Sequence, residues 1–406
     1  MIQRNEYLNK LISWKDEQVI KVITGIRRCG KSTLLELYRE HLKSTGITDE
    51  QIIELNFENP DNDSLLDYKA LYNSVNSRLC KDKMTYIFLD EVQTVPEFQK
   101  AVDGLYIKKN TDVYITGSNA YLLSGELATL LSGRYVEISM LPFSYKEYCE
   151  IRSIAASDES FNQYMMNGGF PYVSVMKPEN NKIDDYIEGI YHTVLFKDIE
   201  ERQKRREPDP AKRKVTDPVL LANISKYLAS VVGSPVSIKS IADYLSSNGR
   251  PISAHTVDDY TDALVEAYIY YPVERMDIVG KQLLKTNKKY YSVDMGLRNH
   301  LLPKRKYDIG FSVENIVYLE LLRRGYKVNI GKSGTSEVDF VAKKDDAYSY
   351  FQITATMLDQ STFDREMKPL RSISDNYEKK VLTLDKIALG NYEGIIVQNV
   401  IEWLMS

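Results

Sequence analysis

The stretch that decides the fold is "VIKVITGIRRCGKSTLLELYREHL", residues 19–42. It begins with an apolar, β-branched run from Val19 to Thr24, continues through the spacing GxxxxGKS, and ends with leucines at helical intervals. Glycines allow a loop to wrap around phosphate oxygens, and the amino end of the following helix adds partial positive charge. The order of strand, glycine-rich loop and helix therefore predicts a site for the phosphates of a nucleotide.

Each polar residue of this loop has an expected role in binding such a nucleotide. Lys31 would reach the β- and γ-phosphates, and the hydroxyl of Ser32 would coordinate Mg²⁺, whereas Thr33 is a neighbour with a lesser role. A chance match to the motif is the alternative, which the strand before it and the helix after it disfavour. The residues assigned to nucleotide binding are Gly25, Arg28, Cys29, Gly30, Lys31, Ser32 and Thr33.

A pair of acidic residues follows in "MTYIFLDEVQ", residues 84–93. The apolar run before them predicts a buried parallel strand that ends at Asp90 and Glu91. Asp90 could hold Mg²⁺ through the water shell of the ion, and Glu91 could polarise an attacking water as a general base. A surface turn that happens to carry two acids is the alternative. The phosphate loop earlier in the chain favours the catalytic interpretation.

Two further stretches supply polar groups to the same predicted site. The strand in "TDVYITGSNAYLL", residues 111–123, ends at Ser118 and Asn119, which could contact the γ-phosphate and the attacking water. Asn56, at the end of "QIIELN", could orient Glu91. Arg134 could stabilise transition-state charge in its own site or in a neighbour's, or it could be a structural surface arginine. The predicted catalytic residues are therefore Lys31, Glu91, Asn119 and Arg134.

Composition narrows the class of protein. The chain has 406 residues and a formal net charge of −4, with 43% hydrophobic residues, as expected for two or three globular domains. No apolar run approaches the roughly 20 residues that a membrane span needs. The cysteines Cys29, Cys80 and Cys149 form no CxxC pair, so we expect reduced thiols and no zinc site. These features predict a cytoplasmic protein without a membrane partner.

The middle of the chain is predicted to be helical. Residues 151–215 are expected to form a helical lid followed by a charged connector, "KRREPDPAKRKVTDP", which is either a solvated linker or a nucleic-acid contact. Residues 216–300 give three helical segments and then two strands, the order of a winged helix–turn–helix. The third helical segment carries Asp258, Asp259, Asp262 and Glu266, a charge that disfavours DNA and favours a lid or protein contact.

Residues 301–406 predict a small α/β domain. An apolar helix precedes the strands "KVNIGK" and "EVDFVAK", which are expected to pair as a hairpin around residues 333–335. A third strand, "YSYFQITAT", follows, and later "YEKKVLTLD" and "YEGIIVQNVIEWLM" are expected to complete the domain with strands and a helix. Strands that alternate with helices along the chain favour a sheet with helices packed on its faces.

These motifs resemble a known family. GIRRCGKST, FLDEVQ and GSNA resemble the AAA-type ATPases of the ASCE division of P-loop NTPases over residues 1–150. With LSGRY, LPFSYKEY, GGFPYV, VDMGLRN, ENIVYLELLRRGY and EVDF, nearly the whole chain resembles prokaryotic AAA-type ATPases whose C-terminal domain of unknown function is related to the restriction-endonuclease-like PD-(D/E)xK fold. The implied fold class is α/β: a P-loop NTPase parallel sheet with helices on both faces, then a helical/winged-helix domain, then a small α/β restriction-endonuclease-like domain.

The C-terminal domain departs from the active members of the nuclease fold. The resemblance implies metal-binding and nucleophile-orienting positions at Glu314, Asp339 and Gln352, and a threonine, Thr354, stands where the lysine belongs. A neutral amide is a weaker ligand for a divalent cation than a carboxylate, and a threonine hydroxyl carries no charge. We therefore expect residues 301–406 to be a degenerate PD-(D/E)xK domain in which Glu314 and Asp339 are structural.

Three functions follow as competing predictions. The first is Mg²⁺-dependent ATP hydrolysis that couples the nucleotide state, ATP or ADP, to the winged-helix and C-terminal domains. The second is a nucleotide-gated module with negligible turnover that binds DNA or a protein, and the third is an ATP-dependent nuclease, which the missing lysine disfavours. The pattern leaves the physiological target and homo-oligomer formation open.

Overall fold

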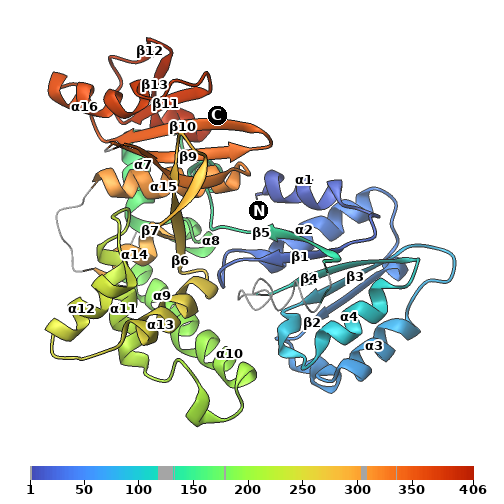
Figure 1. Cartoon of the computed structure of the whole chain (residues 1–406). Helices are drawn as coiled ribbons and strands as arrows, with labels where there is room; N and C mark the ends of the chain where they lie inside the picture. The colour runs from blue at the N-terminus through green and yellow to red at the C-terminus, as the bar shows by residue number, and fades with distance from the viewer. Residues whose placement is uncertain (1, 118–130, 132, 178–179, 303–308, 335) are drawn as a thin grey trace. The chain divides into compact units, whose positions relative to one another are not determined.

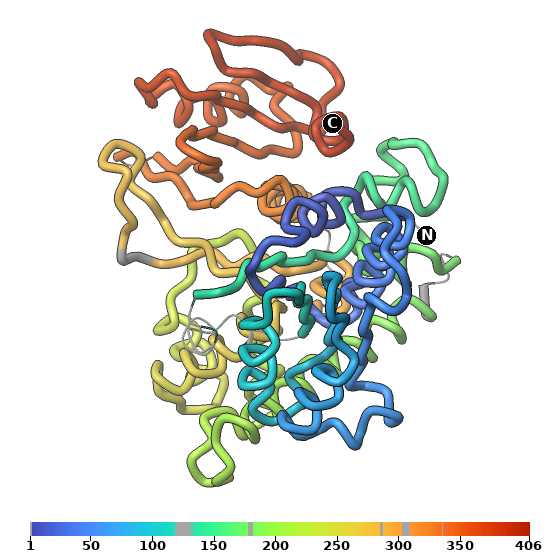
Figure 2. Tube along the Cα trace, turned by 90° about the vertical axis from the view of Figure 1, so that its right-hand side faces the viewer, coloured from blue at the N-terminus to red at the C-terminus, as the bar shows by residue number. Residues whose placement is uncertain are grey.

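The computed structural model describes residues 2–117, 131, 133–177, 180–302, 309–334 and 336–406, and the chain forms two compact units (Figure 1). Unit 1 comprises Met1–Pro142 with Glu266–Tyr268, and unit 2 comprises Phe143–Val265 with Ile269–Ser406. The path of the chain through each unit can be followed by colour in Figure 2.

Unit 1 is built on a five-stranded sheet of order β2-β3-β4-β1-β5, in which every pair of neighbours is parallel. Its strands are β1 Ile20–Thr24, β2 Ile52–Asn56, β3 Thr85–Asp90, β4 Thr111–Thr116 and β5 Tyr135–Ser139. Its helices are α1 Asn5–Ser13, α2 Lys31–Ser44, α3 Tyr68–Ser77 and α4 Phe98–Tyr106, with short 3-10 turns η1 Asp49–Gln51, η2 Pro60–Leu65 and η3 Val92–Thr94.

Both faces of this sheet are covered, because successive side chains of a strand point to opposite sides. Ile87 of β3 lies in the core cluster that contains Leu71 of α3 and Val102 of α4. The next residue, Phe88, contacts Tyr38 of α2 on the other face, with ring centroids 6.2 Å apart. Figure 1 shows α1 and α2 on one side of the sheet and α3 and α4 on the other. The predicted parallel sheet with helices on both faces is confirmed.

Unit 2 contains an eight-stranded sheet of order β12-β13-β11-β10-β9-β8-β6-β7. Its strands are β6 Tyr270–Asp277, β7 Gln282–Ser292, β8 Lys327–Ser333, β9 Ser336–Lys344, β10 Ala347–Thr354, β11 Glu378–Thr383, β12 Gly390–Tyr392 and β13 Ile395–Asn399. Its helices are α6 Tyr145–Arg152, α7 Asp158–Asn167, α8 Pro171–Val175, α9 Asn180–His192, α10 Ile199–Arg206, α11 Pro218–Ser230, α12 Ile238–Ser247, α13 Ala254–Glu266, α14 Met295–Leu301, α15 Ile309–Arg323, α16 Gln360–Arg371 and α17 Val400–Met405. The π-helical turn η5 Thr193–Asp198 joins α9 to α10, and the 3-10 turn η6 Pro210–Lys212 follows.

The predicted order of three helices and a hairpin is present in α11, α12, α13, β6 and β7. The two strands are antiparallel, with Tyr270 opposite Ser292. The hairpin does not end a separate domain, because β6 also pairs in parallel with β8, with Arg275 opposite Ile330. One sheet therefore runs across residue 300. The winged-helix assignment and the subdivisions 151–215, 216–300 and 301–406 stay predictions.

The C-terminal part of unit 2 follows the predicted succession of elements. After α15, the strands β8, β9 and β10 form an antiparallel meander, and β11 returns parallel to β10 after α16. The hairpin expected around residues 333–335 is the one that joins β8 to β9. Helix α15 is almost entirely buried, which explains why its sequence is apolar around most of its circumference.

A buried aspartate ties the loop after α7 to the start of α14. The two carboxylate oxygens of Asp294 accept hydrogen bonds from the backbone N–H of Gly169, at 2.6 Å, and of Leu297, at 3.0 Å. Gly168 has φ 79°, and a Cβ there would lie 2.0 Å from a carboxylate oxygen of Asp294. Burial raises the pKa of Asp294 to about 6. The motifs GGFPYV and VDMGLRN thus meet in one contact within unit 2.

Candidate active site

The phosphate loop connects β1 to α2 and depends on two glycines. Gly25 has φ 140°, and a Cβ there would lie 2.2 Å from the carbonyl oxygen of Met140. Gly30 adopts φ 100° at the N-cap of α2, a conformation that residues with a Cβ rarely adopt. The loop therefore passes close to the end of β5 and turns sharply into the helix, which leaves the first backbone N–H groups of α2 without intrahelical partners.

Lys31 lies folded against its own loop. Its ammonium donates hydrogen bonds to the carbonyl oxygens of Gly25, at 3.1 Å, and Ile26, at 3.3 Å, and lies 3.9 Å from Oε1 of Glu91. Only 4% of the residue is exposed. These oxygens hold the positive charge at the place where phosphate oxygens would compete for it, so the lysine is already directed into the loop.

Asp90 is positioned by polar groups from three elements. Its carboxylate accepts hydrogen bonds from Thr116 of β4 and from the side-chain amide of Asn56 of β2, the latter at 3.1 Å. Burial raises the pKa of Asp90, while hydrogen bonds from Thr116 and from Ser32 act in the opposite direction. The Ser32 hydroxyl therefore lies near the carboxylate of Asp90, where the two oxygens could hold a metal ion.

This pair of oxygen donors fits a magnesium ion. Mg²⁺ is usually held by one or two protein oxygens together with phosphate oxygens and waters, rather than by a cage of side chains. Within the described residues, no group of three or more His, Cys, Asp and Glu side chains could hold a metal ion by itself. A Mg²⁺ at Ser32 and Asp90 would therefore depend on the bound nucleotide for its remaining ligands.

Glu91 begins the 3-10 turn η3 with a left-handed backbone, φ 53°. Its backbone N–H donates to Oγ1 of Thr116 at 3.0 Å, so the hydroxyl of Thr116 bridges the two acidic residues. Its carboxylate accepts a hydrogen bond from the side-chain amide of Gln93. With 7% of the residue exposed, Glu91 is a nearly buried carboxylate directed at the loop, as a general base requires.

The structure brings together the core of the predicted site. Lys31, Ser32, Asp90 and Glu91 converge where β1 and β3 end, at the carboxyl edge of the parallel sheet, where ligands of such sheets bind. The remaining loop residues differ in exposure: Thr33 is exposed, whereas Cys29 is buried, and burial raises the pKa of its thiol. Arg28 adopts φ 69° in the turn before α2.

Two predicted catalytic residues, Asn119 and Arg134, are not among these four. Ser118 and Asn119 fall outside the described residues, so the predicted role of Asn119 stays a prediction. Arg134 is exposed at the start of β5, where its guanidinium lies 5.5 Å from the ring centroid of Tyr106. Within unit 1 it therefore packs on α4, which is the structural alternative, while a role in a neighbouring subunit's site is untested.

Asn56 was expected to orient Glu91 in a switch, and that role stays a prediction. Asn56 donates to Asp90, and the amide that reaches the carboxylate of Glu91 belongs to Gln93. Thr116 was also missed, although a polar residue that ends an apolar strand is a recognisable signal. Arg4, whose guanidinium donates to the carbonyl oxygens of Cys29 and Leu141, both at 2.9 Å, gives no such signal in the sequence.

A lysine from β7 lies among the acidic side chains of Glu314 and Glu337, which form an acidic cluster with Asp339 beside the C-terminal sheet. Lys289 of β7 lies 3.1 Å from Oε1 of Glu314 and 3.1 Å from Oε1 of Glu337, and the hydroxyl of Tyr291 donates to Glu314 at 2.6 Å. Lys289 is 4% exposed. Although burial opposes it, Lys289 and then Arg275 hold the pKa of Glu337 below its usual value. The cluster therefore contains a buried counter-ion that the sequence pattern did not reveal.

The other residues of this cluster are occupied by bonds within the protein. Oδ2 of Asp339 accepts a hydrogen bond from the backbone of Ile353 at 2.8 Å, and burial, reinforced by the charge of Glu314, raises its pKa well above the usual value. Gln352 donates to Glu366 at 2.9 Å, and the hydroxyl of Thr354 donates to the carbonyl of Thr356 at 3.0 Å. These bonds are consistent with a structural role.

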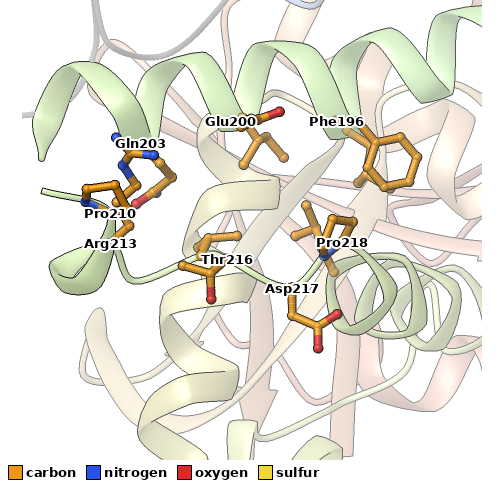
Figure 3. Close-up of a pocket in the computed structure, with 12 residues that line it drawn as sticks. Phe196, Glu200, Gln203, Pro210, Arg213, Thr216, Asp217 and Pro218 are labelled. Carbon is orange, nitrogen blue, oxygen red and sulfur yellow. The ribbon is translucent and has the colours of Figure 1, made fainter. Parts of the chain in front are cut away.

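The charged connector folds back on the helix that precedes it. A pocket of about 410 Å³ separates it from η5 and α10, and Figure 3 shows side chains of both segments directed into that space. The lining residues are Leu195, Phe196, Ile199, Glu200, Gln203, Pro210, Arg213, Val215, Thr216, Asp217, Pro218 and Leu221. Asp217 caps α11 through Leu220, at 3.0 Å, so the connector is an ordered wall of this pocket.

Surface charges on the candidate nucleic-acid elements are partly neutralised within the chain. In α10, Lys204 pairs with Glu200 at 2.6 Å and Arg205 with Glu201 at 3.4 Å. Asp258 and Asp262 of α13 are exposed, which leaves an acidic surface on the helix that was the candidate DNA reader. Among the described residues, no helix has the length and apolar character to cross a membrane.

The sequence of the chain is similar to known proteins along its whole length. A family model described as an AAA domain matches residues 17–149, and one described as a domain of unknown function matches residues 158–308. A protein of Haemophilus influenzae is 40% identical over 411 residues, covering 100% of this chain and 99% of its own length. A protein of Methanocaldococcus jannaschii is 27% identical over 410 residues, covering 93% of this chain and 86% of its own.

Solved structures show more distant similarity. A Walker-type ATPase of Pyrococcus abyssi has a TM-score of 0.46 and 16% identity, covering 74% of this chain and 96% of that chain. AMPPCP-bound DnaA from Aquifex aeolicus has a TM-score of 0.31 and 16% identity, covering 66% of this chain and 89% of that chain.

Proposed function

Because the chain belongs to the same family as its full-length Haemophilus influenzae relative and carries an AAA domain, we propose that it binds and hydrolyses ATP in unit 1. The observation that carries the proposal is the convergence of four groups with distinct chemical tasks. Lys31 and Glu91 lie 3.9 Å apart at the phosphate loop, and beside them the hydroxyl of Ser32 is close enough to Asp90 to oppose the rise in the pKa of its carboxyl. A nucleotide that only filled a groove would not require a buried carboxylate there.

The residues divide the work of phosphoryl transfer to water. The N–H groups at the start of α2 and the ammonium of Lys31 would bind the phosphates, and Ser32 and Asp90 would hold Mg²⁺. When bound, Mg²⁺ neutralises charge on the β- and γ-phosphates. Glu91 would accept a proton from the water that attacks the γ-phosphorus, and its burial beside Thr116 keeps the carboxylate oriented.

Substitution of the loop lysine tests the assignment. Lys31→Ala should reduce ATP turnover to background and weaken nucleotide binding, because it removes the ammonium that lies against the carbonyl oxygens of Gly25 and Ile26 inside the loop. Lys43→Ala is the matched control, because it removes a lysine from the same helix. The side chain of Lys43 is 42% exposed, and its ammonium lies 2.9 Å from the carboxylate of Asp49. Turnover that survives in the Lys31→Ala variant and matches that of the control would refute the proposed active site.

A nucleotide-gated binding module with negligible turnover is the second candidate. It is favoured by the way Lys31 is bound to loop carbonyls, an arrangement that nucleotide binding alone would change. Glu91→Gln separates the two functions in a single-turnover measurement. Loss of hydrolysis with retained ATP binding supports an enzyme. An unchanged rate of hydrolysis shows that Glu91 is not the base.

The C-terminal part of unit 2 we propose to be a restriction-endonuclease-like fold without nuclease activity. The succession α15, β8, β9, β10, α16 and β11 supports the fold, and the internal bonds of Asp339 and Thr354 support the loss of cleavage. Plasmid incubated with Mg²⁺ or Mn²⁺ should stay intact. Cleavage that disappears in an Asp339→Ala variant would contradict the loss of activity.

Besides ATP or ADP, we propose that the protein binds DNA or another protein. The acidic surface of α13 supports a protein contact on that helix rather than DNA. The mass of the protein in solution, measured with ATP or ADP and with or without DNA, distinguishes these partners and also reports self-association. We also propose that the protein is cytoplasmic, as predicted from the sequence.

A further inference from the structure

We propose that Gln93 is a positioning residue that holds the carboxylate of Glu91 for its role as general base; this inference rests on the proposed ATP hydrolysis. The side-chain N–H of Gln93 donates to Oε2 of Glu91, while Oε1 lies 3.9 Å from the ammonium of Lys31. Each oxygen of the carboxylate thus faces a different group. Both Gln93 and Glu91 are nearly buried, with 6% and 7% exposed.

The two contacts of Glu91 have different fates when a nucleotide binds. Lys31 is expected to leave the loop carbonyls for phosphate oxygens, which removes the ammonium from its place beside Oε1. Gln93 lies in η3, two residues beyond the base, and is not part of the phosphate loop. Its amide therefore stays beside the carboxylate through the reaction and limits the orientations that the carboxylate can adopt.

An amide suits this task better than a charged donor. A lysine or arginine at position 93 would stabilise the ionised carboxylate so strongly that it would accept a proton poorly. The neutral N–H of glutamine orients the carboxylate with a smaller loss of basicity. Asn56, the other amide nearby, is committed to Asp90 at 3.1 Å.

The backbone of η3 makes the position of Gln93 reproducible. Glu91 adopts φ 53°, and its N–H donates to Oγ1 of Thr116 at 3.0 Å. A side chain on such a fixed turn loses little freedom when it forms one more bond. The sequence Asp-Glu-Val-Gln therefore encodes the metal ligand, the base and the support of the base within four residues.

Steady-state ATP hydrolysis by the full-length protein tests this role. Gln93→Ala should lower kcat by about 10- to 100-fold, the scale of a misplaced catalytic group, with KM changed by less than about twofold. Gln93→Glu removes the donor and places a second carboxylate against Glu91, so it should lower kcat at least as much as Gln93→Ala, again with KM changed by less than about twofold. Thr94→Val is the matched control, because it removes a hydrogen bond of the same turn without touching the carboxylate.

The outcomes separate this inference from the function on which it rests. A loss of kcat with KM retained in both Gln93→Ala and Gln93→Glu, and no such loss in Thr94→Val, supports the positioning role. Unchanged kcat in Gln93→Ala overturns it, as does an equal loss of kcat in Thr94→Val, since that result shows only a damaged turn. Absence of hydrolysis in the unmodified protein overturns the proposed function itself, and the role of Gln93 with it.

Discussion

Replacement of Lys289 by methionine should destabilise unit 2 severely. The ammonium lies 3.1 Å from one oxygen each of Glu314 and Glu337, and Lys289 and Glu314 are 4% and 6% exposed. Methionine keeps most of the apolar stem and deletes only the charge. Glu314 would then be a buried carboxylate without its counter-ion, and removal of one partner of a buried pair costs about 3–5 kcal/mol.

This magnitude is large enough to be measured by simple denaturation. For a unit of this size, 1 kcal/mol changes the melting temperature by about 2–4 °C, so we expect the melting temperature to fall by roughly 10 °C. The adjacent Lys288 provides the control, because it pairs with Glu274 at 3.3 Å and both side chains are nearly half exposed, at 44% and 45%. Lys288→Met should cost no more than about 1 kcal/mol.

A double variant identifies the physical cause. In Lys289→Met with Glu314→Gln, the uncompensated charge is gone, so a large part of the lost stability should return. Thermal melting followed by circular dichroism, with unfolding confirmed in urea, measures all four proteins. If Lys289→Met melts within about 2 °C of Lys288→Met, or if Glu314→Gln restores nothing, the buried ion pair is not what stabilises this part of the sheet.

Three further outcomes are expected. Gly25→Ala should abolish nucleotide binding, measured with a fluorescent ATP analogue, because its Cβ would lie 2.2 Å from the carbonyl oxygen of Met140; binding within about twofold of the unmodified protein would contradict this close approach. Arg4→Ala should weaken ATP binding by about 5- to 10-fold and lower the melting temperature, since two carbonyl groups lose a charged donor; Lys10→Ala, on the exposed face of α1, should do neither. For Asp294, whose pKa is raised to about 6, the stabilising protonated form is complete below about pH 4 and is lost as the pH rises through 6. The free energy of unfolding relative to Asp294→Asn should therefore fall by about 3 kcal/mol across that window, and a flat difference in urea denaturation would exclude this linkage.

Much of the nucleotide site could be predicted because its chemistry is written in contiguous residues. The loop from Gly25 to Ser32 and the pair Asp90–Glu91 each lie at the end of one buried strand, and parallel strands bring such ends to one edge. To assign both motifs to one site, the prediction had to be right in two respects only: each motif follows a buried β-strand, and the two strands run in the same direction. That is why Lys31 and Glu91, 60 residues apart in the chain, could be assigned together before their contact at 3.9 Å was known.

The residues that were missed depend on local angles and long-range pairing. Gln93 reaches Glu91 because the turn between them has a left-handed first residue, φ 53°, which no pattern in the letters specifies. Lys289 reaches Glu314 because β7 and α15 pack together, although its own sequence, NKKYYSVD, shows only a strand. The lysine beside Glu314 therefore comes from β7, whereas the position two residues after Gln352 in β10 holds Thr354.

The pairing of β6 with β8 makes the carboxy-terminal third of the chain inseparable from the helices before it. A protein truncated near residue 300 would present β6 with an open edge of unpaired backbone groups, and such edges promote aggregation. Gene fragments ending there should yield insoluble material, and recombination at that point should be selected against. The strands after residue 300 thus complete a sheet that the rest of unit 2 needs in order to fold.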